Sequence, residues 1–392
     1  MKRRFRPAPG VAVALLVSAA CALGQDVDID ALKVVASQSL RYDSNLFRRS
    51  ADQQSETLST TTAGVEFDKR YSLQRVELDL SFNHHRYRSN SYLDFDAVNY
   101  RAAWHWSLTP RLHGLLSRTR SEDINTFDYY RSFDRNLRTD LTTTGNFEYE
   151  VGRDWSLLGG MTQDERSNER PTAQQGDYSL RSASVGGRRS FPSGSSVSYR
   201  YIDGRGDYKN RIPGVSASPT AFDQTVHELR ARWPVSAKTT LTATIAHVQR
   251  EHPGYAVRNF SGTRGNIGLL WNATGKTGIQ VTLARDISSY QTDTASFVTS
   301  NRLALYPYWS LGPRTVLYGG YDLSRQSFGG ALPGTTDDNR EDRTATATLG
   351  MRWNPIEALS LTATLGHERR TSNLDGYGYR NRSARMDARF AF

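Results

Sequence analysis

Alternation of apolar and polar side chains recurs along most of the chain, and it constrains the fold more than any other feature of the sequence. Every second residue is apolar in 75–82, and 344–353 and 359–366 repeat the pattern. Such a period of two places successive side chains on opposite faces of a β-strand. No long window after residue 24 shows the 3.6-residue period of a helix. We therefore expect an all-β protein whose strands each have one apolar and one polar face.

Two kinds of connection separate these strands of roughly ten residues. The short connections are rich in turn-forming residues, at 107–110, 151–154, 192–194, 273–276, 312–313 and 354–355. The long connections are polar and aromatic, at 43–56, 121–137, 165–177, 203–222, 326–342 and 371–380. Short turns at one end and long loops at the other are typical of an outer-membrane barrel, with the turns in the periplasm and the loops outside the cell.

Aromatic residues mark the strand ends beside the short turns, where rings settle at a membrane interface. The expected interface girdle is Phe67, Trp106, Tyr149, Phe191, Trp233, Trp271, Trp309, Trp353 and Phe392, at spacings of 38 to 44 residues. Nine such ends predict nine hairpins, hence a single transmembrane antiparallel β-barrel of about 18 strands over 32–392; 16 strands is the alternative. A soluble β-propeller also repeats at about 40 residues, but it needs no lipid-facing girdle.

The two ends of the chain indicate export to the bacterial outer membrane. Basic residues followed by the apolar run 11–23 and the small-x-small sequence 22–24 predict a signal peptide over 1–24. A short periplasmic segment, 25–31, then precedes the barrel. A lipoprotein anchored at Cys21 is the alternative, but the large aliphatic residue usual three positions earlier is missing. The chain stops on Phe392 after an alternating segment, which resembles the terminal strand recognised by the barrel assembly machinery.

Little in the sequence points to catalysis or cofactors, so we expect a protein that is not an enzyme. The eight histidines show no metal-ligand spacing, and we predict no metal, cofactor or catalytic residue. We predict that the tripeptide 205–207 lies at the tip of a polar outer loop. The acidic run 337–342 could bind a divalent cation, but it lacks the spacing of a calcium loop and reads as an ordinary solvated loop. The net charge of +10 is spread along the chain without a nucleic-acid-binding motif, so nucleic acid is not expected as a partner.

The polar strand faces predict a hydrophilic lumen with an excess of arginine on the later strands. The residues expected to line a transport path are Arg101, His105, Arg200, Arg230, Arg232, Arg264, Arg302, Arg352, Arg385 and Arg389. Guanidinium groups offer planar donor forks to carboxylate, sulfate or phosphate. The same arginines could instead brace the wall through ion pairs with acidic residues, and the sequence leaves both roles open.

One family resemblance suggests a function. The segment 40–48, Leu-Arg-Tyr-Asp-Ser-Asn-Leu-Phe-Arg, resembles the "yDsNvfr" opening of EpsL-type outer-membrane barrels associated with exopolysaccharide biosynthesis. The resemblance implies a porin-like conduit in exopolysaccharide secretion. Its partners would be the polysaccharide chain, periplasmic export proteins, and the lipids and lipopolysaccharide of the outer membrane. Two alternatives stay open: a general or anion-preferring diffusion porin, and a surface or scaffold barrel that acts through its loops.

Overall fold

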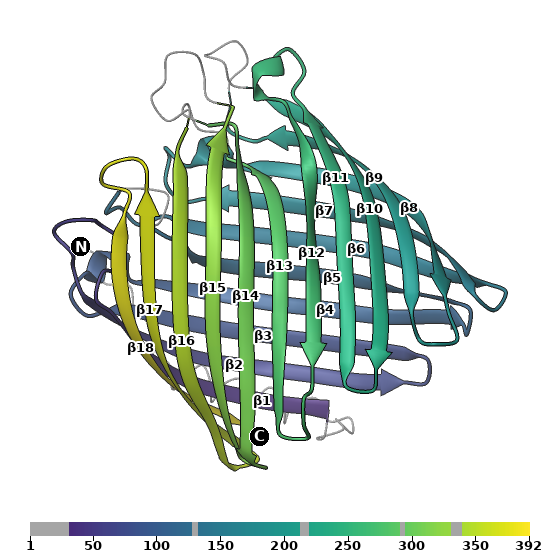
Figure 1. Ribbon diagram of the computed structural model, residues 1–392, viewed down its shortest axis with the longest axis horizontal. Helices are drawn as coiled ribbons and strands as arrows, with labels where there is room; N and C mark the ends of the chain where they lie inside the picture. The colour runs from purple at the N-terminus through teal and green to yellow at the C-terminus, as the bar shows by residue number, and fades with distance from the viewer. Residues whose placement is uncertain (1–30, 128–131, 212–218, 291–294, 331–338) are drawn as a thin grey trace, which may run out of the picture.

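The computed structural model, which describes residues 31–127, 132–211, 219–290, 295–330 and 339–392, is a closed antiparallel β-barrel (Figure 1). Each strand pairs with its neighbours in sequence, and the first strand pairs with the last. The strands are β1 (Leu32–Asp43), β2 (Glu56–Tyr71), β3 (Gln74–Tyr87), β4 (Phe95–Thr109), β5 (Leu112–Ile124), β6 (Leu137–Val151), β7 (Trp155–Asn168), β8 (Tyr178–Ser190), β9 (Ser196–Tyr208), β10 (Ala221–Ser236), β11 (Thr239–Glu251), β12 (Phe260–Trp271), β13 (Thr277–Ser289), β14 (Phe297–Gly312), β15 (Thr315–Gly329), β16 (Glu341–Ile356), β17 (Leu359–Ser372) and β18 (Tyr379–Ala391).

The 18 strands confirm the predicted barrel, and the 16-stranded alternative is wrong. Short turns at one end follow β2 and every second strand after it, while longer loops lie at the other end. Gly152 and Gly194 sit in two of the short turns with φ of 71° and 76°, a conformation that favours glycine. No helix within the described residues is long and apolar enough to cross a membrane.

Several predicted connections begin inside strands that run further than expected: residues 107–109 belong to β4, 121–124 to β5, 165–168 to β7 and 326–329 to β15. The tripeptide at 205–207 lies inside β9 and not in a loop. Residues 354–355 belong to β16, whose register with β17 shifts between Trp353 and Ile356, so the turn itself falls after Ile356. The predicted signal peptide over 1–24, with Cys21, lies outside the described residues, as do residues 337–338 of the acidic run.

The closure between β1 and β18 joins the two ends of the chain. The register runs from Val35 opposite Ala391 to Asp43 opposite Ser383. At the short-turn end, the backbone N–H of Val34 donates to the carbonyl of Phe392 at 2.7 Å, and the reverse bond measures 3.1 Å. The continuous ladder leaves no open sheet edge here, as a membrane-spanning sheet requires.

The outer face of the barrel carries an apolar belt. Met161, Leu349 and Leu365 are 72%, 63% and 61% exposed at mid-strand positions. The strand registers place seven of the nine expected girdle residues on this face: Phe67, Trp106, Tyr149, Trp233, Trp271, Trp309 and Trp353. Phe191 and Phe392, just beyond the ends of β8 and β18, are 38% and 60% exposed. A continuous belt of exposed apolar side chains around a closed barrel is the surface that lipid covers.

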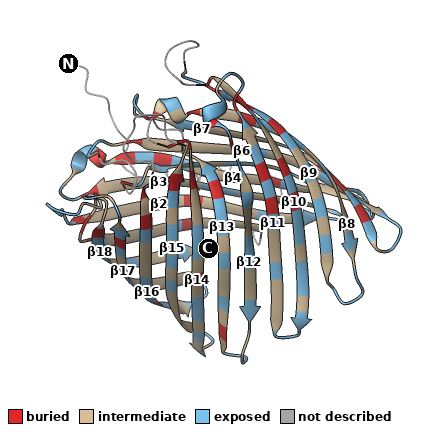
Figure 2. Cartoon of the chain, turned by 45° about the horizontal axis from the view of Figure 1, so that its top comes forward, coloured by how far each residue is buried: buried red, intermediate tan, exposed pale blue. Residues whose placement is uncertain are grey.

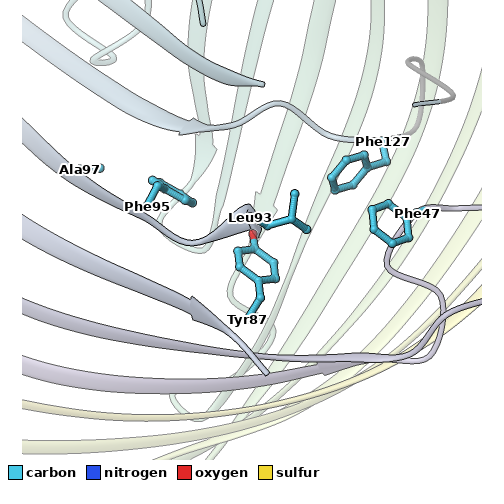
Figure 3. Packing of buried hydrophobic residues seen from close by; sticks show 6 residues of the cluster. All are labelled: Phe47, Tyr87, Leu93, Phe95, Ala97 and Phe127. Carbon is cyan, nitrogen blue, oxygen red and sulfur yellow. The ribbon is translucent and has the colours of Figure 1, made fainter. Parts of the chain in front are cut away.

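Buried side chains concentrate instead at the long-loop end (Figure 2). The largest cluster joins the first long loop, the loop after β3 and the loop after β5 through Phe47, Leu93 and Phe127 (Figure 3). The rings of Phe47 and Phe127 meet edge to face with centroids 4.8 Å apart. These loops therefore pack against one another and against the inner wall near that end of the barrel.

Candidate transport lumen

The outward tryptophans identify the inner face of the barrel, because successive residues of a strand point to opposite faces. Trp233 is 55% exposed on the outer face, so Arg232 and Arg230 on the same strand alternate to the inside. The same reasoning, carried through the strand registers, places on inner-face positions all of Arg101, His105, Arg200, Arg230, Arg232, Arg264, Arg302, Arg352, Arg385 and Arg389.

Five of these ten side chains form ion pairs along the wall, and a sixth, His105, lies beside a carboxylate. Arg101 and His105 both approach Glu77, with N···O distances of 3.7 and 3.3 Å. Arg230 pairs with Glu228 at 2.7 Å and Arg385 with Asp387 at 2.7 Å. Arg389 reaches Glu66 at 2.5 Å across the closure, and Arg302 pairs with Asp322. Such contacts between neighbouring side chains stabilise the barrel wall, as expected if these arginines have a structural role.

The other four arginines contact no carboxylate within ion-pair distance in the described part of the chain. Arg232 donates to the backbone carbonyl of Gly194 at 3.3 Å. Arg200, Arg264 and Arg352 have no such bond there, and we call these three the free lumen arginines. Arg200 and Arg264 lie on one register row, on either side of Glu228 and Ala246. Their donor forks are therefore available to a solute in the lumen.

Acidic and basic side chains occupy different parts of the inner wall. On β2–β7 the acids outnumber the arginines by about two to one: Glu56, Glu66, Asp68, Glu77, Asp79, Asp123, Asp140, Glu148, Glu150 and Asp164 against Arg70, Arg75, Arg101, Arg138 and Arg166. On β8–β18 the ratio reverses: Arg188, Arg200, Arg230, Arg232, Arg250, Arg264, Arg302, Arg352, Arg370, Arg385 and Arg389 against Glu228, Asp286, Asp322, Asp342, Glu368 and Asp387. The lumen thus has an acidic wall and a basic wall.

Sequence reasoning missed part of this basic wall. Arg188 lies on β8, where the pair Gly186-Gly187 obscures the alternation. Arg250 and Arg370 lie near the long-loop end, where both faces of a strand are polar and parity cannot be read directly. Counting every second residue from the nearest outward tryptophan would have identified all three.

An inner cavity of about 970 Å³ lies beside the closure. Strands on both sides of the seam contribute charged side chains to it, including Arg41, Arg352, Arg385, Asp43 and Glu56. Leu46 and Phe127 from two long loops line it as well. The cavity is therefore a polar chamber, bordered by the packed loops at the long-loop end.

The acidic run near residue 340 is engaged by arginine where the structure describes it. Asp342 is fully buried and accepts from Arg340 at 2.7 Å, and Arg370 lies 3.8 Å away. Among the described residues, no group of three or more His, Cys, Asp or Glu side chains is arranged to hold a metal ion. Asp342 thus contributes to a buried ion-pair network at the barrel mouth.

Comparison with known proteins shows that the fold is that of porin barrels. Residues 232–392 match the family described as "Putative beta-barrel porin 2". Similar solved structures include Pseudomonas aeruginosa OccK2 (OpdF), at 13% identity and a TM-score of 0.53, covering 92% of this chain and 97% of that one. P. aeruginosa OpdK with vanillate has 11% identity and a TM-score of 0.51, covering 93% and 99%. A BenF-like porin from Pseudomonas fluorescens Pf-5 has 11% identity and a TM-score of 0.52, covering 92% and 98%. No curated protein sequence matches the chain.

These findings correct the family resemblance drawn from residues 40–48. The matching family and the similar structures are porins, and none belongs to the EpsL-type exopolysaccharide barrels, so that assignment was wrong. The segment has a structural explanation instead. Asn45 is fully buried and its side chain donates to the carbonyls of Arg49 and Arg380, at 2.8 and 3.0 Å. The motif thus fastens the first loop to β18. The protein is a porin-like β-barrel of the bacterial outer membrane.

Proposed function

We propose that the protein is a diffusion porin that favours small anionic solutes, carboxylates above all. The observation that carries the proposal is the set of free lumen arginines, Arg200, Arg264 and Arg352, on the basic wall. An arginine already paired with a carboxylate contributes little net field, whereas an unpaired one attracts anions and offers a bidentate fork to a carboxylate.

The division of the lumen into acidic and basic walls supports the same function. Solutes between walls of opposite sign experience a transverse field, which orients a molecule that has a charged end and a polar end. Ion pairs such as Arg302–Asp322 hold the basic wall in place. Because inner-face arginines and acids nearly balance over the whole barrel, we expect a mild anion preference and not strict exclusion of cations.

Two barrels of this fold were solved with small carboxylates. OpdK was determined with vanillate and OccK2 (OpdF) in complex with glucuronate, each at low sequence identity to this chain. The similarity to these barrels is one of fold alone. We therefore use vanillate and glucuronate only as probes of suitable size and charge.

The test compares uptake of glucuronate with uptake of uncharged glucose in proteoliposomes. The variant changes the three free lumen arginines to Gln: Arg200→Gln, Arg264→Gln and Arg352→Gln. The matched control changes three arginines on the outer face of β8 and β9: Arg181→Gln, Arg189→Gln and Arg205→Gln. We expect the lumen variant to lower the glucuronate-to-glucose ratio by about two- to five-fold, as loss of a local positive field requires.

The outer-face control should leave that ratio unchanged, and heat-modifiable mobility should show that both variants are folded. Equal ratios for the wild type and a folded lumen variant would contradict a role of these arginines in solute selection. A wild-type barrel that admits neither sugar would contradict the porin proposal itself.

A further inference from the structure

A second concentration of arginine lies on the outside of the barrel, toward the long-loop end. The strands β13 to β18 carry these outward residues, which we call the arginine sector: Arg285, Arg325, Arg343, Arg369, Arg380 and Arg382. Glu341 is the acidic residue on this outer surface within the described residues of those strands. The lumen function makes no use of these side chains, because they point away from the lumen.

The strand registers align the sector into rows. Arg285 lies opposite Asn301, which lies opposite Arg325, and Arg325 lies opposite Arg343. Arg325 and Arg343 are 55% and 67% exposed, and one carboxylate, that of Glu341, bonds both at 2.5 and 3.0 Å. Like charges placed directly across a ladder repel. A single shared carboxylate leaves the row with net positive charge.

An apolar groove of about 880 Å³ runs over the outer wall below this row. Its outward lining includes Ile245, Ile267, Leu283, Leu303 and Leu323, and the arginines Arg285, Arg325 and Arg343 border it. The upper end of the groove reaches the level at which β12 and β13 separate, since their pairing runs only from Trp271 up to Gly265, opposite Arg285.

The depth of the row corresponds to the edge of the membrane. Arg325 lies eight residues from Leu317, the register partner of the girdle residue Trp309. Eight residues of a strand tilted by about 40° rise roughly 20 Å, close to the apolar band of about 25 Å in such barrels.

The opposite outer wall has a different charge at the same end. Strands β7 to β11 present Glu165, Asp203, Asp207, Asp223 and Glu251 outward, together with Arg181 and Arg205. The basic character of β13–β18 is therefore a local property of one side of the barrel, and not a general feature of its rim.

We propose that the arginine sector and its groove bind a phosphorylated glycolipid of the outer leaflet, the lipid A part of lipopolysaccharide. The phosphates bond Arg285, Arg325 and Arg343, and acyl chains lie along the groove beneath them. Charge complementarity, the depth of the row and the apolar floor all require an amphiphile whose anionic head sits at the membrane surface. Guanidinium is well suited to this role because it binds phosphate with two parallel hydrogen bonds.

The test measures binding of diphosphorylated lipid A to the purified full-length barrel in detergent, by native mass spectrometry. The probes are lipid A, its dephosphorylated form and inorganic phosphate. The variant carries Arg285→Gln, Arg325→Gln and Arg343→Gln, and the control carries Arg181→Gln and Arg205→Gln on the opposite wall. A third variant replaces the same three sector residues by Lys, which keeps the charge and protects the test if the Gln variant does not fold.

We expect the Gln variant to bind lipid A about ten-fold more weakly or worse, as loss of several charge-assisted bonds requires. The Lys variant should stay within about three-fold of the wild type, because it keeps the positive charges. The opposite-wall control should bind normally. Equal binding of lipid A and its dephosphorylated form would overturn the proposal, as would unchanged binding by a folded Gln variant. Competition by inorganic phosphate at the same concentration would show a free-anion site and overturn the assignment to lipid.

Discussion

At the scale of single residues, glycine and aromatic side chains pair across the strands of this barrel. Six register pairs place an aromatic ring directly over a glycine: Trp106–Gly114, Phe147–Gly159, Phe222–Gly206, Phe297–Gly329, Tyr308–Gly278 and Tyr318–Gly350. A Cβ added at any of these glycines would collide with its partner ring. Glycine therefore weakens the alternation read from the sequence, yet it is required by cross-strand packing.

Replacing one of these glycines should destabilise the barrel. We expect Gly159→Ala to displace the Phe147 ring and lower the stability by about 1–3 kcal/mol, the usual cost of overpacking. Gly187→Ala is the matched control on the next strand, where the nearest atom to an added Cβ lies 3.8 Å away. Urea unfolding in detergent micelles measures both, and an equal midpoint shift would show that ring packing is not responsible.

His252, in the loop after β11, should make this end of the barrel sensitive to acid. Burial and the nearby charges of Arg250 and Arg211 lower the pKa of its imidazole to about 4. The neutral ring lies 3.3 Å from the Tyr208 hydroxyl. Because the pKa is lower in the folded state, its stability contribution is complete above about pH 6.5 and is lost as the pH falls toward 4.

Hydrogen exchange of the loop 252–259 should therefore accelerate between pH 6.5 and 4, after correction for intrinsic rates. His252→Gln should flatten that dependence because glutamine does not titrate. His247→Gln, an exposed histidine on the outer face of β11, serves as the control. A variant that retains the full pH dependence would assign the effect to another group.

At the scale of strands and loops, the sequence predicts most of the fold because lipid imposes a strict pattern. The nine hairpins expected from alternation and aromatic spacing are present as the 18 strands of the barrel. Beyond the membrane both faces of a strand meet water, so alternation disappears and the polar end of β9 at Arg205 resembles a loop. Loop packing, such as the Phe47–Phe127 contact, depends on long-range contacts that no local pattern encodes.

Asn45 connects the first loop to β18 beside the barrel closure through a set of hydrogen bonds that we call the clasp. Its side-chain oxygen accepts from the Arg49 backbone at 3.0 Å, and its own backbone N–H donates to the Asn381 side chain at 3.0 Å. We expect Asn45→Ala to cost about 1–3 kcal/mol, because buried partners lose their hydrogen bonds. Ser50→Ala, at an exposed position of the same loop, should cost nothing measurable. Thermal unfolding distinguishes the two, and equal midpoints would disprove the clasp.

The terminal strand should matter for assembly more than the loop end does. Phe392 is 60% exposed on the outer face and its backbone closes the ladder with Val34. We expect Phe392→Ala to reduce the yield of inserted barrel well below that of Arg205→Ala, because the residue combines an interface anchor with the proposed recognition signal for the barrel assembly machinery. Heat-modifiable barrel in isolated outer membranes is the readout. Equal yields for the two variants would argue against a special role of the terminal residue.

At the scale of the whole molecule, the arrangement of charge depends on register, which the sequence leaves open. Alternation alone indicates that Arg302 and Arg264 face inward, but only the strand register shows that Asp322 pairs with Arg302 while Arg264 has no carboxylate partner among the described residues. The separation of acidic and basic walls, and the arginine sector outside, follow from the same long-range alignment. Selectivity is therefore a property of the assembled barrel and not of any local motif.

The most direct measurement is the reversal potential of the wild-type barrel in a planar bilayer under a potassium chloride gradient. We predict a mild anion preference at low salt. That preference should shrink as salt is raised, because the Debye length falls from about 10 Å at 0.1 M to about 3 Å at 1 M. The lumen variant Arg200→Gln, Arg264→Gln, Arg352→Gln should move the potential toward cation preference. A folded wild-type barrel that conducts with cation preference at low salt would contradict the account.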